Sequence, residues 1–387
     1  MKIDEVKKEA ALTLAEISRV SETFASPVPE LLGDVPSERI SLSPQDFPVP
    51  ELILFGLRKL CDLKSWGPFE KLRWGISAQF RKVPFSVTLQ KFGLHLYIPV
   101  GTSADMQKEI VRYLQKIAKL AENCLRDQAK LQIEAGNVTI ENQYHRFDGA
   151  YQFFRDRAKL AYESPPAEPV PFSWGKDGKQ TGWSQQPWKY QIEGGYLAAA
   201  MLDAYFSRLE HLLVLVLSFT DFEPSSNGLV EFVGKKWGEK FQAIFDVRSD
   251  PDAARTFQQL QEMKEMVRNP MSHGGFRKKG TSFLFHLEDV GALPGLLTKE
   301  PRSFELWITP VPQRTYEELC KQLDAVDAFF ERSKIAAGVR YAKSGLNVVF
   351  SADYRAAYHE ASESLEDLDE FIRHQGNLTD RHRNMDY

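Results

Sequence analysis

One short segment combines residue types that could act on a phosphodiester. It reads RNPMSH over residues 268–273, so His273 follows Arg268 by five positions and Asn269 follows the arginine directly. Imidazole can take up or release a proton near neutral pH. Guanidinium presents a planar set of donors to non-bridging phosphate oxygens, where charge develops in the transition state. We expect only about 0.01 chance matches to this pattern in a chain of this composition.

The proline inside this segment determines whether the two side chains can meet. On an unbroken helix, a five-residue offset would place Arg268 and His273 about 140° apart. Pro270 lacks an N–H and disfavours the helical conformation of Asn269, so it predicts a bend. A bend at a helix end brings the guanidinium and the imidazole towards one site.

An upstream helix, expected over residues 190–220, carries polar side chains that could orient this pair. The helix is apolar on most sides, but Asp203, Ser207 and Glu210 fall on one face. Polar groups on a buried helix need partners, which an arginine and a histidine from another helix would supply. Alternatively, Glu210 and Arg268 form only a buried ion pair that fixes helix contacts.

Three consecutive basic residues follow the motif: Arg277, Lys278 and Lys279, called the basic triplet below. Glycines flank the triplet, and residues 268–280 contain no acid although the whole chain carries a net charge of −4. We expect these side chains to contact an RNA backbone. The alternative interpretation is a solvated turn between a helix and a strand.

The elements that must position these residues are mostly helical. A charged helix is expected over residues 2–24, an antiparallel meander over 72–100, and helices over 104–135 and 140–162. Four prolines open a Pro/Trp-rich linker at 164–189. Beyond the 190–220 helix, we expect helices at 229–245, 250–267, 315–336 and 351–373, with strands at 281–287 and 303–309. Asp250-Pro251-Asp252 is typical of a helix start. The predicted fold class is mostly α with small β elements.

Composition excludes several classes of protein. With 43% hydrophobic and 12% aromatic residues, the chain can build sizeable cores. Its longest apolar run is far shorter than the roughly 20 residues that span a membrane. The three cysteines are widely spaced, and no metal-binding motif is present, so we expect neither a disulfide framework nor a metal or other cofactor. The N-terminus lacks the apolar core of a secretory signal, so a cytoplasmic location is expected.

Residues 190–340 resemble the HEPN superfamily, a group of helical bundles that includes many metal-independent ribonucleases. Its motif is an Arg followed after four to six residues by a His, often with a polar residue next to the Arg, and Arg268, Asn269 and His273 match it. The family often carries an acidic or polar residue on an earlier helix, for which Glu210 is the candidate. Gly275 stands where some HEPN toxins carry a Tyr that is modified. The resemblance implies a homodimer with a composite active site.

The sequence thus predicts an endoribonuclease that cleaves RNA by 2′-OH transesterification, as a bacterial anti-phage effector or toxin. Catalysis is assigned to Arg268, His273, Asn269 and Glu210. One alternative is a non-catalytic HEPN-like dimerisation or nucleotide-sensing module of a larger complex. Another is a toxin silenced by an antitoxin or defence-system partner protein. The expected organisation is an N-terminal α+β domain (1–163), the linker (164–189), the HEPN-like helical domain (190–340), and an acidic helix with a polar tail (341–387).

Overall fold

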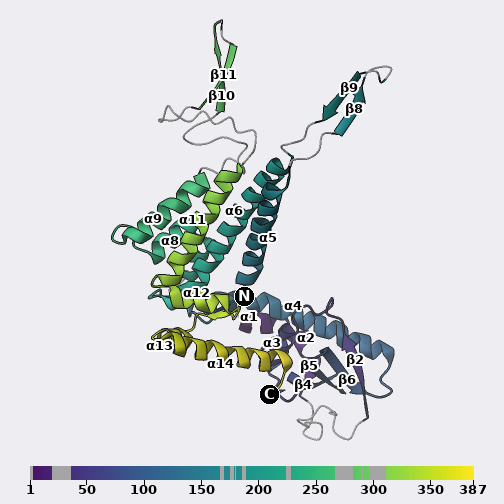
Figure 1. Ribbon diagram of the computed structural model, residues 1–387. Coiled ribbons are helices and arrows are strands. Elements are labelled where there is room, and N and C mark those ends of the chain that lie inside the picture. Colours follow the sequence, from purple (N-terminus) through teal and green to yellow (C-terminus); the bar gives the residue numbers. More distant parts are fainter. Residues whose placement is uncertain are drawn as a thin grey trace. The chain divides into compact units, whose positions relative to one another are not determined.

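The computed structural model describes residues 3–19, 36–165, 170–174, 178, 180–184, 189–223, 228–265, 282–289, 291–296 and 311–387. The fold is mostly helical with small antiparallel sheets, which confirms the predicted fold class (Figure 1). Its contacts form two compact units. Unit 1 comprises residues 1–135 and 373–387, and unit 2 comprises residues 136–372.

Unit 1 is built on an antiparallel sheet with the strand order β1-β4-β5-β6-β2, and β3 also pairs with β4. The strands are β1 (Ile17–Ser18), β2 (Ser37–Leu42), β3 (Ser65–Trp66), β4 (Leu72–Phe80), β5 (Val83–Gln90) and β6 (Gly93–Pro99). Alternating apolar side chains on β4, β5 and β6 form one continuous face, as the period of a strand requires. The meander expected over residues 72–100 is confirmed.

Helices cover the apolar face of this sheet. The long helix α4 (Ala104–Glu134) begins at Ser103, whose side chain accepts a hydrogen bond from the Met106 N–H. Ile110, Leu114 and Ile117 of α4 are buried with the sheet, together with part of α3 (Glu51–Lys59). The expected long helix is therefore confirmed. Unit 1 also contains α1 (Ile3–Glu9) and α2 (Ala11–Leu14), which replace the single helix expected over residues 2–24.

Unit 2 is a helical bundle with one large apolar core. Three long helices lie side by side in it: α5 (Tyr144–Glu163), α6 (Lys189–Leu215) and α11 (Gln313–Arg332) (Figure 1). Shorter elements complete the unit: η2 (Val216–Phe219), α7 (Gly228–Gly234), α8 (Trp237–Ile244), α9 (Pro251–Met263), α12 (Ala336–Lys343) and α13 (Ala352–Ala361). Most of α6 is buried, as its apolar sequence predicts.

Short strand pairs add to the second unit. They are β7 (Thr139–Ile140) with β12 (Val348–Val349), β8 (Val170–Trp174) with β9 (Gln180–Ser184), and β10 (Ser282–Leu287) with β11 (Gly291–Leu296). The β8–β9 hairpin lies inside the segment expected to be an irregular linker. Pro171 is accommodated because this hairpin is only two strands wide, so each strand has a free edge. The strand expected over residues 281–287 corresponds to β10, whereas the one expected over 303–309 lies outside the described residues.

The unit boundaries differ from those expected from the sequence. Residues 136–163 belong to the helical unit, because α5 packs along α6 through Tyr151, Ala158 and Tyr162. Two helices, α13 and α14 (Leu365–Asn384), replace the single helix expected over residues 351–373, and α14 also occupies most of the expected polar tail. None of the helices in the described ranges is long and apolar enough to cross a membrane.

Candidate functional site

The predicted catalytic motif follows directly on α9. Asp250 begins this helix as expected, because its side chain accepts hydrogen bonds from the backbone N–H groups of Asp252 and Ala253 at 3.0 Å each. The described chain continues to Glu265. Arg268, Asn269 and His273 lie outside the described residues, and so does the basic triplet Arg277, Lys278 and Lys279.

Aromatic side chains connect α9 to α8, and α8 to α6. The indole of Trp237 contacts Phe257 of α9 at 5.5 Å and Phe206 of α6 at 5.4 Å between ring centroids. The ammonium group of Lys264 lies over the same indole, 5.6 Å from its centroid, where cation–π attraction favours it. The end of α9 is therefore held against α8, and the same indole of α8 contacts α6.

Glu210 lies one turn beyond Phe206 on α6 and is half-exposed. Its carboxylate Oε2 is 3.8 Å from Nζ of Lys240 on α8, and the Lys240 side chain is only 5% exposed. Phe206–Trp237 and Glu210–Lys240 are thus successive contacts between α6 and α8. Within the described chain, the ion-pair partner of Glu210 is Lys240.

The other two polar residues on the predicted face of α6 are solvent-exposed. Asp203 and Ser207 lie on the accessible side of the helix, and the Ser207 hydroxyl donates to the Asp203 carbonyl oxygen at 3.0 Å. The expectation that these two side chains are buried is therefore wrong. The charged residue of α6 that is buried is Arg208, which is not among the residues predicted from the sequence.

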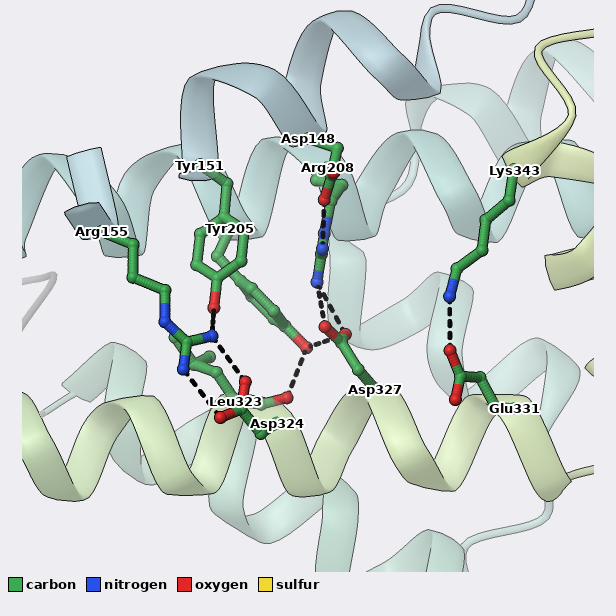
Figure 2. Close-up of polar contacts among 10 residues, drawn as sticks. All are labelled: Asp148, Tyr151, Arg155, Tyr205, Arg208, Leu323, Asp324, Asp327, Glu331 and Lys343. Carbon is green, nitrogen blue, oxygen red and sulfur yellow. Dashed lines mark hydrogen bonds and ion pairs between the residues drawn. The ribbon is translucent and has the colours of Figure 1, made fainter. Parts of the chain in front are cut away.

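Arg208 is the centre of a polar network between α5, α6 and α11 (Figure 2). Its guanidinium donates to Asp148 at 2.5 Å and to both carboxylate oxygens of Asp327 at 2.7 and 2.6 Å. The rings of Tyr151 and Tyr205 flank it, each with its centroid 4.6 Å from the guanidinium carbon. One cation thus joins three helices.

Burial and charge act in opposite directions on this network. Burial of the Arg208 guanidinium is the largest influence and opposes its charge, but Asp327, through its charge and its hydrogen bond, acts together with Tyr205 and Tyr144 to raise the pKa of Arg208. Burial also raises the pKa of Tyr151 to about 12 and the pKa of Tyr205 well above its usual value. The phenols are therefore neutral hydrogen-bond donors at physiological pH, and the Tyr205 hydroxyl donates to Asp327 at 2.8 Å.

A second, more exposed arginine repeats the arrangement one turn away. Arg155 donates to both oxygens of Asp324, at 2.5 and 2.7 Å, and to the Tyr151 hydroxyl at 2.8 Å (Figure 2). Its side chain is 24% exposed, compared with 5% for Arg208. Both arginines are satisfied by carboxylates, so these two pairs fix the three-helix arrangement and offer no activated nucleophile or base.

Two clefts open on the surface of unit 2. One, of about 420 Å³, lies between α5 and α11; the other, of about 540 Å³, lies among η2, α7, α8 and α13. The first is lined by three acidic and three basic side chains, and the second contains Asp221 and Glu231 as well as Lys235 and Lys334. Neither cleft therefore selects a ligand by net charge.

Two histidines in the described ranges, His211 and His95, have structural contacts. The His211 Nε2 atom accepts the Gln143 backbone N–H at 2.9 Å, and burial lowers the pKa of His211. His95 lies 3.4 Å from the Ser41 hydroxyl. Within the part of the chain that the structure describes, no three His, Cys, Asp or Glu side chains are grouped as metal ligands. No protein-family model, curated protein or solved structure matches the chain.

Proposed function

We propose that the chain is a metal-independent endoribonuclease of the HEPN type. The observation that carries this proposal is the motif itself, in which Arg268 is followed by Asn269 and, five positions on, by His273. Three features support it: the motif follows a helix of a mainly helical core, the end of that helix contacts Trp237 of α8, and Trp237 in turn contacts Phe206 of α6, one turn before Glu210. The proposed catalytic body is therefore unit 2.

The proposed reaction is transesterification. His273 removes the proton from a ribose 2′-OH, and the 2′ oxygen attacks the adjacent phosphorus. The bond from phosphorus to the 5′ oxygen breaks, and that oxygen receives a proton from the conjugate acid of a motif histidine. Arg268 stabilises the charge on the non-bridging oxygens, while Asn269 and Glu210 orient the pair. The products are a 2′,3′-cyclic phosphate and a 5′-OH end, and no water is consumed in this step.

The proposal includes the biological setting inferred from the resemblance. Two protomers would contribute their motifs to a composite site in a homodimer. The protein would act in the cytoplasm as an anti-phage effector or toxin, controlled by an antitoxin or a defence-system partner.

Cleavage of total cellular RNA by the purified protein tests the proposal. Arg268→Ala and His273→Ala should each abolish cleavage while leaving the far-UV circular dichroism and the oligomeric state unchanged. The chain offers matched controls in Arg255, which is exposed on α9, and His359, which is exposed on α13. Arg255→Ala and His359→Ala should retain activity. Near-normal cleavage by either motif variant would refute the assigned roles.

Two chemical tests distinguish this mechanism from metal-dependent hydrolysis. EDTA should not inhibit the reaction, and 2′-O-methylated RNA and DNA should not be cut, because both lack the nucleophile. The upstream fragment should end in a 2′,3′-cyclic phosphate. Strict dependence on magnesium or manganese would exclude the transesterification mechanism.

A further inference from the structure

The two faces of the sheet in unit 1 have opposite chemical character. Residues paired directly across the strands share a face, so the strand register assigns each side chain to one of the two faces of the sheet. The face formed by Ile76, Val87 and Leu96 is apolar and is covered by helices. The opposite face, here called the polar face, carries the polar and aromatic side chains of Ser18, Arg39, Ser41, Trp66, Ser77, Gln79, Ser86, Thr88, Gln90, His95 and Tyr97. The same register also places Ser37, Leu72, Gly75, Pro84, Gly93 and Pro99 on it.

The side chains of the polar face hold one another in place. The Ser77 and Ser86 hydroxyls lie 2.9 Å apart. The Gln90 amide donates to the Thr88 hydroxyl at 3.1 Å and to the Tyr97 hydroxyl at 2.8 Å. Hydrogen bonds of this kind fix rotamers before any ligand arrives, which lowers the entropic cost of binding.

Aromatic rings on this face lie among small residues. Trp66 lies flat over Gly75: a Cβ atom added to that glycine would come within 2.3 Å of the indole. The indole N–H donates to the Ser77 hydroxyl at 3.3 Å. Trp66 and Tyr97 are partly exposed, whereas Ser86, Thr88 and His95 between them are buried. The rings of Trp66 and Tyr97 are therefore more accessible than the side chains that lie between them on the polar face.

The polar face carries a positively charged side chain and, among the described residues of the sheet, no negatively charged one. No Asp or Glu occupies it among the described residues of the sheet, although the chain has 53 acidic residues against 49 basic ones. Arg39, on the edge strand β2, is exposed. Glu38, the neighbouring acid on β2, has the opposite orientation and accepts a hydrogen bond from Gln107 of α4.

We propose that the polar face binds single-stranded RNA. Trp66 and Tyr97 offer rings on which bases can stack, and the Gln and Ser side chains can pair with base edges and 2′-hydroxyls. Arg39 supplies a phosphate contact, and the absence of carboxylates avoids repulsion of the backbone. This inference rests on the proposed function and extends it, because it gives the N-terminal unit the task of holding the substrate.

Fluorescence anisotropy with a short labelled single-stranded RNA of mixed sequence tests this binding. The full chain carrying His273→Ala is used in EDTA so that the RNA stays intact. Arg39→Glu should weaken binding roughly tenfold and flatten its salt dependence. The matched control is Arg112→Glu, since Arg112 is exposed on α4, which covers the other face. This control should change the affinity less than about twofold.

Photo-cross-linking tests where the RNA binds and requires no substitution in the sheet. RNA containing 4-thiouridine, bound to the same His273→Ala chain, should cross-link to peptides that contain Trp66 or Tyr97. If cross-links avoid both peptides and Arg39→Glu binds like Arg112→Glu, the polar face is an ordinary solvated surface and the inference is wrong.

Cleavage assays separate this inference from the proposed function. If the catalytically intact chain cuts RNA and Arg39→Glu leaves its KM unchanged, the ribonuclease proposal survives and the binding inference fails. If RNA binds and cross-links at the polar face but is never cut, the binding inference survives and the ribonuclease proposal fails. In the expected result, Arg39→Glu raises KM and leaves kcat nearly unchanged.

Discussion

Asp327→Ala tests how far the buried guanidinium of Arg208 depends on its carboxylate partners. The change removes two hydrogen bonds of 2.7 and 2.6 Å from Arg208, and it also removes the acceptor of the Tyr205 hydroxyl. Only Asp148 remains beside a side chain that is 5% exposed. Because an arginine keeps its charge, it cannot escape this cost by deprotonation.

The expected loss in the free energy of unfolding of unit 2 is about 4 kcal/mol. Removing one partner of a buried ion pair typically costs about 3–5 kcal/mol, mainly because an uncompensated charge stays buried. Asp324→Ala is the matched control, one turn earlier on α11. It also removes a two-oxygen contact to an arginine, but Arg155 is 24% exposed and Asp324 is 56% exposed, so water can replace the carboxylate. We expect a loss of about 1 kcal/mol or less for the control.

Hydrogen exchange as a function of urea, read by mass spectrometry on peptides from α6 and α11, reports the stability of unit 2 separately from unit 1. Equal losses in the free energy of unfolding for Asp327→Ala and Asp324→Ala would refute the argument that burial of the arginine makes its carboxylate partner more important. A loss below about 1 kcal/mol for Asp327→Ala would show that Asp148 alone compensates the guanidinium.

His211 should make the stability of unit 2 depend on pH, because burial lowers its pKa in the folded state. Its contribution to stability is present above about pH 6.5 and is lost as pH falls through the folded pKa. His211→Gln, which keeps an acceptor for the Gln143 N–H, should flatten the loss of amide protection in α5 between about pH 7 and 5. Asp250→Ala should destabilise α9 by about 1 kcal/mol through loss of its cap, seen as faster amide exchange in that helix. Charge reversal of the basic triplet to Glu should weaken RNA binding across sequences and lower the log–log salt slope by roughly 0.7 per lost contact, without moving the cleavage site.

Local patterns predicted the meander and the long helices well. The alternation along β4, β5 and β6 is visible in the sequence, because one face of the sheet must be apolar. The C-terminal helices show a local signal that was overlooked. The Ser364 hydroxyl accepts the Asp367 N–H at 3.1 Å, so a helix start lies inside the segment interpreted as one helix. A Ser followed three residues later by an acid could have predicted the break.

The Arg208 network could not be predicted in the same way. Its partners Asp148 and Asp327 are 60 and 119 residues away in the sequence, so only the tertiary fold brings them together. Asp203, Ser207 and Glu210 share a helical face in the sequence, but the polar residue of α6 that is buried is Arg208. An arginine three residues after Tyr205 and four before Leu212, on the apolar face of the helix, is the signal that points to such a network.

The hydrogen bonds that Arg208 donates to carboxylates decide whether its guanidinium could contact a phosphate in unit 2. A guanidinium has five N–H donors in a fixed plane, and the donors on both terminal nitrogens of Arg208 face carboxylates at 2.5 to 2.7 Å. Aromatic rings lie within 4.6 Å of it, so a phosphate would have to displace carboxylates from an enclosed site. Arg155 is held by Asp324 in a similar way. The phosphate contact of the proposed reaction therefore needs an arginine outside this network, which is the role assigned to Arg268. If Arg268→Ala still cleaved RNA, neither network arginine could take its place without disrupting the three-helix core, and the mechanism itself would have to be replaced.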